Sequence, residues 1–249
     1  MKMSPSRRNL GLVWAALGGA VLLIAVVAIV IGMSSGATQT PTPNIPSAPP
    51  TSTQNTPGSS STTEPSAGDS VDASVRELGW VAEPITRDGD VYVRAALSAA
   101  STFDTQLAVR DQWLSFLDSW FTPDTRYATA DQTAELESAR LELRQSVVLP
   151  ESEWESLDSE AGRVVATVNG PIDFQVVPDD ESGDMSIGTA DVVLMITRTD
   201  GSDGELSYED TVRVSVQVLC GAGSVPTPDS AQQAGDCKVV RFFPEPLEP

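Results

Sequence analysis

Residues 206–220 read LSYEDTVRVSVQVLC, and the alternation in their second half decides the fold. In an extended strand, successive side chains point to opposite faces of the sheet. The four valines between residues 212 and 218 therefore share one face, while Arg213, Ser215 and Gln217 share the other. A strand that is apolar on one face and polar on the other predicts a sheet with one face in the core.

The same period of two recurs in four other segments of the second half of the chain. Residues 200–204 (DGSDG) lie between two of these segments and predict an antiparallel hairpin, and residues 178–184 predict another. The predicted strands cover residues 162–169, 171–178, 187–199, 206–220 and 237–243.

Before residue 160 the apolar residues follow the period of a helix. In residues 107–121, four large apolar side chains recur at the spacing i, i+3, i+4 and i+7, which places them on one helix face: Trp113, Phe116, Leu117 and Trp120. Residues 88–90 (DGD) offer N-caps for an earlier helix. The predicted helices cover residues 91–103, 107–121 and 130–148, with a further helical turn at 150–157.

Helices followed by antiparallel strands predict an α+β fold, with three helices packed on a curved antiparallel sheet as in a cystatin-like cone. Trp113, Trp120 and Trp154 could mark a binding surface. Their helical or helix-edge positions fit core packing better, so we expect them to be buried.

Residues 10–33 (LGLVWAALGGAVLLIAVVAIVIGM) contain no charged side chain. A helix of this length spans roughly 36 Å, which is enough for a hydrocarbon core of about 30 Å. Lys2, Arg7 and Arg8 precede it, so the positive-inside rule predicts a cytoplasmic tail at residues 1–9 and a single-pass cell-membrane protein whose C-terminal domain is extracytoplasmic. A cleaved secretory signal is the alternative, although its apolar region runs only about 7–15 residues.

Residues 34–70 consist almost entirely of Ser, Thr, Pro, Gly, Ala, Gln and Asn. Such a segment buries too little apolar surface to offset the entropy of ordering, so we expect a disordered linker, with or without O-glycosylation. At about 3.1 Å per residue it could reach as far as about 115 Å from the membrane. The remaining residues, 71–249, have the length of one globular domain.

The charge of the chain is strongly acidic, at −20 with no histidine. Lys2, Arg7 and Arg8 lie before the apolar run, and Glu64 and Asp69 lie in the linker, so residues 71–249 carry a net charge of −21. Phosphates would repel such a domain, which argues against a nucleic-acid partner. The lipid bilayer is expected to contact residues 10–33 alone.

The chain has two cysteines, Cys220 and Cys237, which lie near the ends of two predicted strands. In an extracytoplasmic domain this arrangement predicts a structural disulfide, and a pair of free buried thiols is the alternative. The loop between them, residues 221–236, is polar and is expected to be flexible.

Catalysis has little support in this sequence. Without histidine there is neither a Ser-His-Asp arrangement nor a histidine-based zinc site, and the common phosphate-loop, nucleophile-elbow and dinucleotide motifs are absent. Paired carboxylates such as Asp111 with Asp118 could in principle catalyse glycoside hydrolysis. Acidic residues are so frequent in this chain, however, that such pairs are expected by chance. Residues 179–184 and 200–205 are rich in carboxylates, yet neither follows the spacing of a calcium loop. We therefore expect no enzyme activity, no cofactor and no metal.

A short cytoplasmic start, one membrane helix, a low-complexity spacer and a helices-then-sheet domain resemble the single-pass actinobacterial conjugation and secretion proteins. Residues 103–105 (FDT), 110–114 (RDQWL) and 120–127 (WFTPDTRY) carry the resemblance, which covers roughly residues 90–220. The outer domains of these proteins look like the nuclear transport factor 2 fold. Related domains in type IV secretion systems act as inner-membrane assembly subunits without catalysis.

The resemblance implies a non-enzymatic, membrane-anchored cell-envelope protein, an assembly or scaffold subunit whose partners are other membrane or envelope proteins. The alternative is an extracytoplasmic protein that binds a small ligand in the pocket of the cone. The sequence leaves the oligomeric state open.

Overall fold

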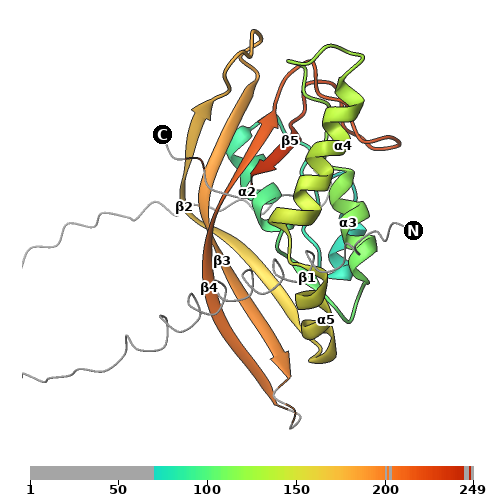
Figure 1. Ribbon diagram of the computed structural model, residues 1–249, viewed down its shortest axis with the longest axis vertical. Coiled ribbons are helices and arrows are strands. Elements are labelled where there is room, and N and C mark those ends of the chain that lie inside the picture. The colour runs from blue at the N-terminus through green and yellow to red at the C-terminus, as the bar shows by residue number, and fades with distance from the viewer. Residues whose placement is uncertain (1–69, 200, 202–203, 244–246, 248–249) are drawn as a thin grey trace, which may run out of the picture. The chain divides into compact units, whose positions relative to one another are not determined.

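The computed structural model describes residues 70–249, except for residues 200, 202–203, 244–246 and 248–249 (Figure 1). The predicted cytoplasmic tail, membrane helix and linker, apart from Ser70, lie outside the described residues. Within the described part of the chain, none of the helices has the length and apolar character that a membrane crossing requires.

Within the described residues, five antiparallel strands form one sheet in chain order. They are β1 (Phe103–Asp104), β2 (Arg163–Val176), β3 (Met185–Thr199), β4 (Glu205–Leu219) and β5 (Lys238–Phe243). The helical segments are η1 (Ala73–Leu78), α2 (Gly89–Ala99), α3 (Arg110–Asp118), α4 (Gln132–Glu142), η2 (Leu143–Val147) and α5 (Glu151–Ser159). This arrangement confirms the predicted α+β class.

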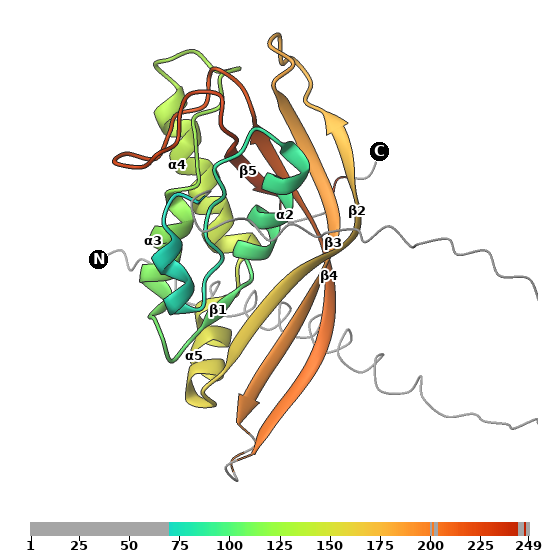
Figure 2. The same cartoon turned by 180° about the vertical axis from the view of Figure 1, so that it is seen from behind.

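The sheet is strongly curled, and the helices lie on one side of it in both views (Figures 1 and 2). Helix α2 packs against β2, β3 and β4. Asp88 caps this helix as the sequence predicts, because its Oδ1 accepts hydrogen bonds from the backbone N–H groups of Asp90 (2.9 Å) and Val91 (3.3 Å). The core lies between the sheet and the helices.

The prediction of separate strands at 162–169 and 171–178 is wrong, because the structure has one strand, β2, over this stretch. Its pairing with β3 breaks after Asn169 and resumes at Asp173. Gly170 takes a left-handed conformation with φ of 72°, which lets the strand bend at a bulge without ending. A Gly-Pro pair that reads as a chain break in the sequence is therefore a kink within a strand.

The predicted helix boundaries also need correction. The helix predicted at 91–103 ends at Ala99, and Phe103 lies in β1, paired with Val164 of β2. The helix predicted at 107–121 covers only Arg110–Asp118, so Trp120 follows it. The helix predicted at 130–148 is α4 followed by the π-helical η2, the helical turn at 150–157 is the nine-residue helix α5, and η1 was not predicted.

The tryptophans lie in the core, as predicted. Trp113 is 0% exposed and Trp120 is 1% exposed. The ring of Trp113 lies 5.0 Å from Phe103 and 5.6 Å from Trp154, centroid to centroid. Phe116 is only half-buried and stacks on Trp80. An aromatic cluster therefore joins α3, α5 and β1.

Candidate functional site: a groove between the sheet and helix α5

A groove of about 740 Å³ lies between the inner face of the sheet and the helical layer. The strands contribute apolar side chains to it, and the η2–α5 segment and the end of α2 form its other walls. The apolar residues that line it from the sheet are Val164, Leu194, Ile196, Val212 and Val214.

The groove arises because the helices cover only part of the long strands. In β4 the inward-facing Val216 and Val218 are fully buried, whereas Val212 and Val214 on the same face are only partly buried. Figure 1 shows β3 and β4 continuing past α5 at the bottom of the view. One valine stripe therefore serves as core at one end and as a groove wall at the other.

Charged and aromatic side chains lie where the groove meets solvent. Arg198 Nη1 donates to Glu160 Oε2 at 3.0 Å, and its guanidinium lies 5.5 Å from the centre of the Tyr208 ring. Asp210 and Glu153 also line the groove, and within the described residues neither forms an ion pair. The groove is therefore lined by two arginines, Arg198 and Arg213, and by two carboxylates that lie in no ion pair within the described residues.

The groove borders a stretch of β4 that, within the described residues, has no paired strand on the side away from β3. Strand β5 pairs with β4 only from Ser215 to Leu219. Among the strands that the structure describes, none pairs with Glu205–Val214 on the side away from β3. No strand of the described residues takes up the backbone N–H and C=O groups along this side, although the Thr211 N–H donates to Asp210 Oδ1 at 2.8 Å.

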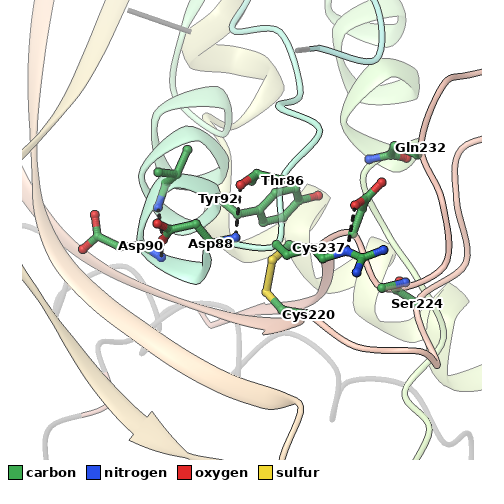
Figure 3. Close-up of a disulfide and its surroundings, with 12 residues drawn as sticks. Thr86, Asp88, Asp90, Tyr92, Cys220, Ser224, Gln232 and Cys237 are labelled. Carbon is green, nitrogen blue, oxygen red and sulfur yellow. Dashed lines mark hydrogen bonds and ion pairs between the residues drawn. A yellow bond between two sulfur atoms is a disulfide. The ribbon is translucent and has the colours of Figure 1, made fainter. Parts of the chain in front are cut away.

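The two cysteines form a disulfide with an S–S distance of 2.03 Å. The bond joins the residue after β4 to the residue before β5, next to the N-terminal end of α2 (Figure 3). The Cys237 N–H donates to Thr86 O at 2.7 Å, and the Cys220 N–H donates to Asp184 O at 2.9 Å. The bridge thus connects β4, β5 and the segment that leads into α2, which is a structural role.

The loop between the cysteines is polar, as expected, and several of its residues contact the rest of the domain. Ser224, Gln232 and Asp236 are buried. Thr227 Oγ1 donates to Ser119 O at 3.1 Å, at the end of α3. The polar composition of residues 221–236 is typical of a solvent-exposed loop. The buried polar side chains of this loop instead form hydrogen bonds inside the fold.

The main partner of this loop is a buried ion pair that the sequence analysis did not find. Lys238 Nζ lies 2.8 Å from Glu83 Oε1, and both side chains are 1% exposed. The Lys238 ammonium also donates to Ser119 O (2.7 Å) and Thr227 Oγ1 (2.8 Å). Tyr92 Oη donates to the same Glu83 oxygen at 2.6 Å. The signal was present in the sequence, since Lys238 is the only lysine after residue 2 and stands in an apolar strand.

We expect this cluster to make the domain sensitive to alkaline pH. Burial, together with the nearby charge of Glu83, raises the pKa of Tyr92 well above 10.0. A group whose pKa is raised by folding contributes stability that is fully present below its unfolded pKa and is lost as the pH rises from that value through the folded pKa. Above pH 10, unfolding free energy should therefore fall more steeply in the wild type than in Tyr92→Phe, by up to about 1.4 kcal/mol per pH unit. Urea titrations between pH 8 and pH 11 measure the two slopes, and equal slopes would contradict the prediction.

Loss of the disulfide should lower stability without changing the fold. The Cys220→Ala/Cys237→Ala variant should lose about 3 kcal/mol of unfolding free energy, the loop-closure value for a loop of this size. Urea denaturation of the variant and of the oxidised wild type measures the difference. Reduction of the wild type should reproduce most of it. An unchanged midpoint in both experiments would show that the packed loop holds β5 without the bridge.

The two carboxylates that the sequence analysis considered as a catalytic pair, Asp111 and Asp118, differ in their surroundings. Asp118 forms an ion pair with Arg144, and Asp111 is exposed at the start of α3. In the loop before β3, Asp180 Oδ2 accepts the Met185 N–H at 2.8 Å. Within the described residues, no three side chains of His, Cys, Asp or Glu are grouped as metal ligands would be.

The chain matches no protein-family model and no curated protein. Two solved structures have a distantly similar shape. One is an IcmL-like type IV secretion system protein from Legionella pneumophila, at 13% identity and a TM-score of 0.38, with 64% of this chain and 91% of that chain covered. The other is CagV from Helicobacter pylori, a VirB8 homolog of the type IV secretion system, at 14% identity and a TM-score of 0.33, with 59% and 88% covered.

Proposed function

We propose that this protein is a non-enzymatic, membrane-anchored cell-envelope subunit that assembles with other envelope proteins in a conjugation- or secretion-type complex. The anchor in the proposal is residues 10–33, and the secretion-type context comes from the sequence resemblance. The structural observation that supports an assembly role is the exposed apolar surface of the long strands.

Apolar side chains are exposed on both faces of the strands where they extend past the helices. On the face away from the helices, Val165 of β2 and Met195 of β3 are cross-strand partners and are 52% and 36% exposed. On the inner face, Leu206 and Tyr208 of β4 are exposed. Clustered exposed apolar residues are typical of protein–protein contact sites.

Co-purification tests the proposal. Full-length chain with an affinity tag, gently solubilised from its native membranes, should retain a reproducible set of other envelope proteins. The Val165→Lys/Met195→Lys variant should lose part of that set. A matched control, Val109→Lys/Val225→Lys, replaces two apolar residues away from the sheet that are 60% and 53% exposed, and it should keep all of that set. A wild-type chain that purifies alone, or a control that behaves like the variant, would count against an assembly role.

A second candidate function is supported by the groove itself. Its volume of about 740 Å³ falls within the roughly 300–1,000 Å³ of small-molecule sites, and its walls are largely apolar. If the protein binds a small apolar ligand, uncharged fatty alcohols of suitable length should raise its melting temperature, by an amount that grows with the logarithm of ligand concentration above the Kd. Unchanged melting with fatty alcohols, together with co-purification of envelope proteins, would favour assembly over ligand binding.

A further inference from the structure

We infer that the open edge of β4, residues 205–214, receives an extended basic segment of a partner protein as an added strand, whose alternate apolar side chains occupy the groove. This inference rests on the proposed assembly function and names the kind of partner segment. Three features of the described residues support it: the open edge, the continuity of that edge with the groove, and the charge around it.

The open edge offers hydrogen bonds that a partner strand can satisfy. Along Glu205–Val214, alternate backbone N–H and C=O groups point away from β3, and no described strand pairs with them. Natural sheets protect such edges with short strands, bulges, prolines or inward-pointing charges. Here the stretch is ten residues long and has no proline or glycine. It has one inward-pointing charge, Asp210, whose Oδ1 accepts the Thr211 N–H at 2.8 Å, so this backbone donor already has a partner within the chain. An extended segment can add to such an edge through main-chain hydrogen bonds.

The side chains of an added strand would continue existing rows into the groove. Val164, Ile196 and Tyr208 are neighbours across β2, β3 and β4 on the inner face. The next inner row consists of Ala166, Leu194 and Asp210. Side chains that lie opposite one another on neighbouring strands point to the same face of the sheet. Every second residue of a strand added next to β4 would therefore extend these rows beside the groove. Apolar residues at those positions would cover the partly exposed wall that the helices leave open.

The charge at the edge favours a basic partner over a second copy of this chain. This stretch has three acidic residues, Glu205, Glu209 and Asp210, and one basic residue, which gives it a net charge of −2. The basic residue, Arg213, forms ion pairs with Asp173 and Asp191 on the neighbouring strands. Glu205 is paired with Arg163, whereas Glu209 and Asp210 form no ion pair within the described residues. Two β4 edges paired antiparallel would bring these carboxylates near one another, and like charges on neighbouring strands are destabilising. Lysine or arginine side chains on the incoming strand would be attracted instead.

A synthetic peptide of alternating valine and lysine, long enough to span Glu205–Val214, is the probe. The experiment uses the full-length chain in detergent micelles and measures peptide affinity by fluorescence anisotropy and backbone amide exchange by mass spectrometry. We expect the peptide to slow amide exchange in residues 205–214. We expect the Glu209→Lys/Asp210→Lys variant to bind it about tenfold more weakly, which corresponds to about 1.4 kcal/mol. The control Glu77→Lys/Glu181→Lys changes the net charge equally at exposed sites elsewhere and should bind within about twofold of the wild type.

Several outcomes would overturn the inference. Equal weakening in variant and control would show attraction by net charge alone, and protection outside residues 205–214 would show another site. Concentration-dependent protection of this edge without peptide, accompanied by dimers in sedimentation, would make the occupant a second copy.

The inference and the proposed function can fail separately. If Glu209→Lys/Asp210→Lys still co-purifies with every envelope protein that the wild type retains, the edge inference fails and the assembly role stands. If the peptide protects β4 but the wild type retains no envelope protein, the assembly role fails and the edge remains a strand-binding site.

Discussion

Lys238→Met should lower the free energy of unfolding of residues 70–249 by about 3–5 kcal/mol, the cost of leaving a buried charge without its partner. Methionine fills most of the volume of the lysine stem but cannot donate to Glu83, whose carboxylate is 1% exposed. The Ser119 carbonyl and the Thr227 hydroxyl lose the same donor. Urea denaturation of the isolated domain, with the disulfide intact, measures the change.

Two further variants separate the charge from the packing. Glu83→Leu/Lys238→Met removes both charges and should recover part of the lost stability, because no unpaired ion remains buried. Recovery should be incomplete, since Tyr92 Oη and Gln232 Nε2 both donate to Glu83 in the wild type. Arg163→Met, which breaks an exposed ion pair with Glu205, should change stability little. If Lys238→Met is no less stable than Glu83→Leu/Lys238→Met, the unpaired charge of Glu83 is not the cause of the lost stability.

The same pair explains how a polar loop of this length is held in place. Glu83 precedes α2, Ser119 ends α3, Thr227 lies in the loop between the cysteines, and Lys238 begins β5. The ammonium lies within hydrogen-bond distance of all three partners. Lys238→Met should therefore loosen residues 221–236 even where the disulfide remains intact.

The sequence predicted the sheet better than the helices, for a physical reason. Alternation in residues 206–220 depends only on which face each side chain takes, so it identified the inner face of β4 directly. Helix ends depend on local competition instead. The chain turns after α2 at residues 100–101, and pairing of Phe103 with Val164 makes residues 103–104 a strand. That pairing is a long-range contact.

The groove could not be read from the valine stripe that forms it. Val212 and Val218 stand in the same alternating pattern, yet one is partly buried in the groove wall and the other is fully buried. The difference depends on how far the helices extend over the sheet, which local periodicity does not encode. The disulfide was predictable because two cysteines allow one intrachain pairing. The ion pair joins residues 155 positions apart, and only the lone lysine hinted at it.

Trp113→Ala should cost about 3–5 kcal/mol of unfolding free energy, as for other fully buried large aromatic side chains. The Trp113 ring is 0% exposed and contacts Phe103 and Trp154, so its removal leaves a cavity between α3, α5 and β1. One term reduces the cost: within the described residues Trp113 Nε1 has no hydrogen-bond partner, and the substitution relieves that unsatisfied donor.

The free-energy cost of the cavity should exceed the gain from removing the unsatisfied donor. An unsatisfied donor costs only about 1–3 kcal/mol, and the substitution also removes the contacts of the ring with two aromatic neighbours. Against a typical margin of 5–15 kcal/mol, this loss should lower the melting temperature clearly, and a domain whose margin is near 5 kcal/mol would be partly unfolded near 37 °C. Val109→Ala, at an exposed position just before α3, is the matched control and should melt like the wild type. If Trp113→Ala also melted like the wild type but lost its envelope partners, this face of α3 would be an interface and not the core. The burial of Trp113 between three elements predicts the opposite, a large loss of stability that precedes any loss of binding.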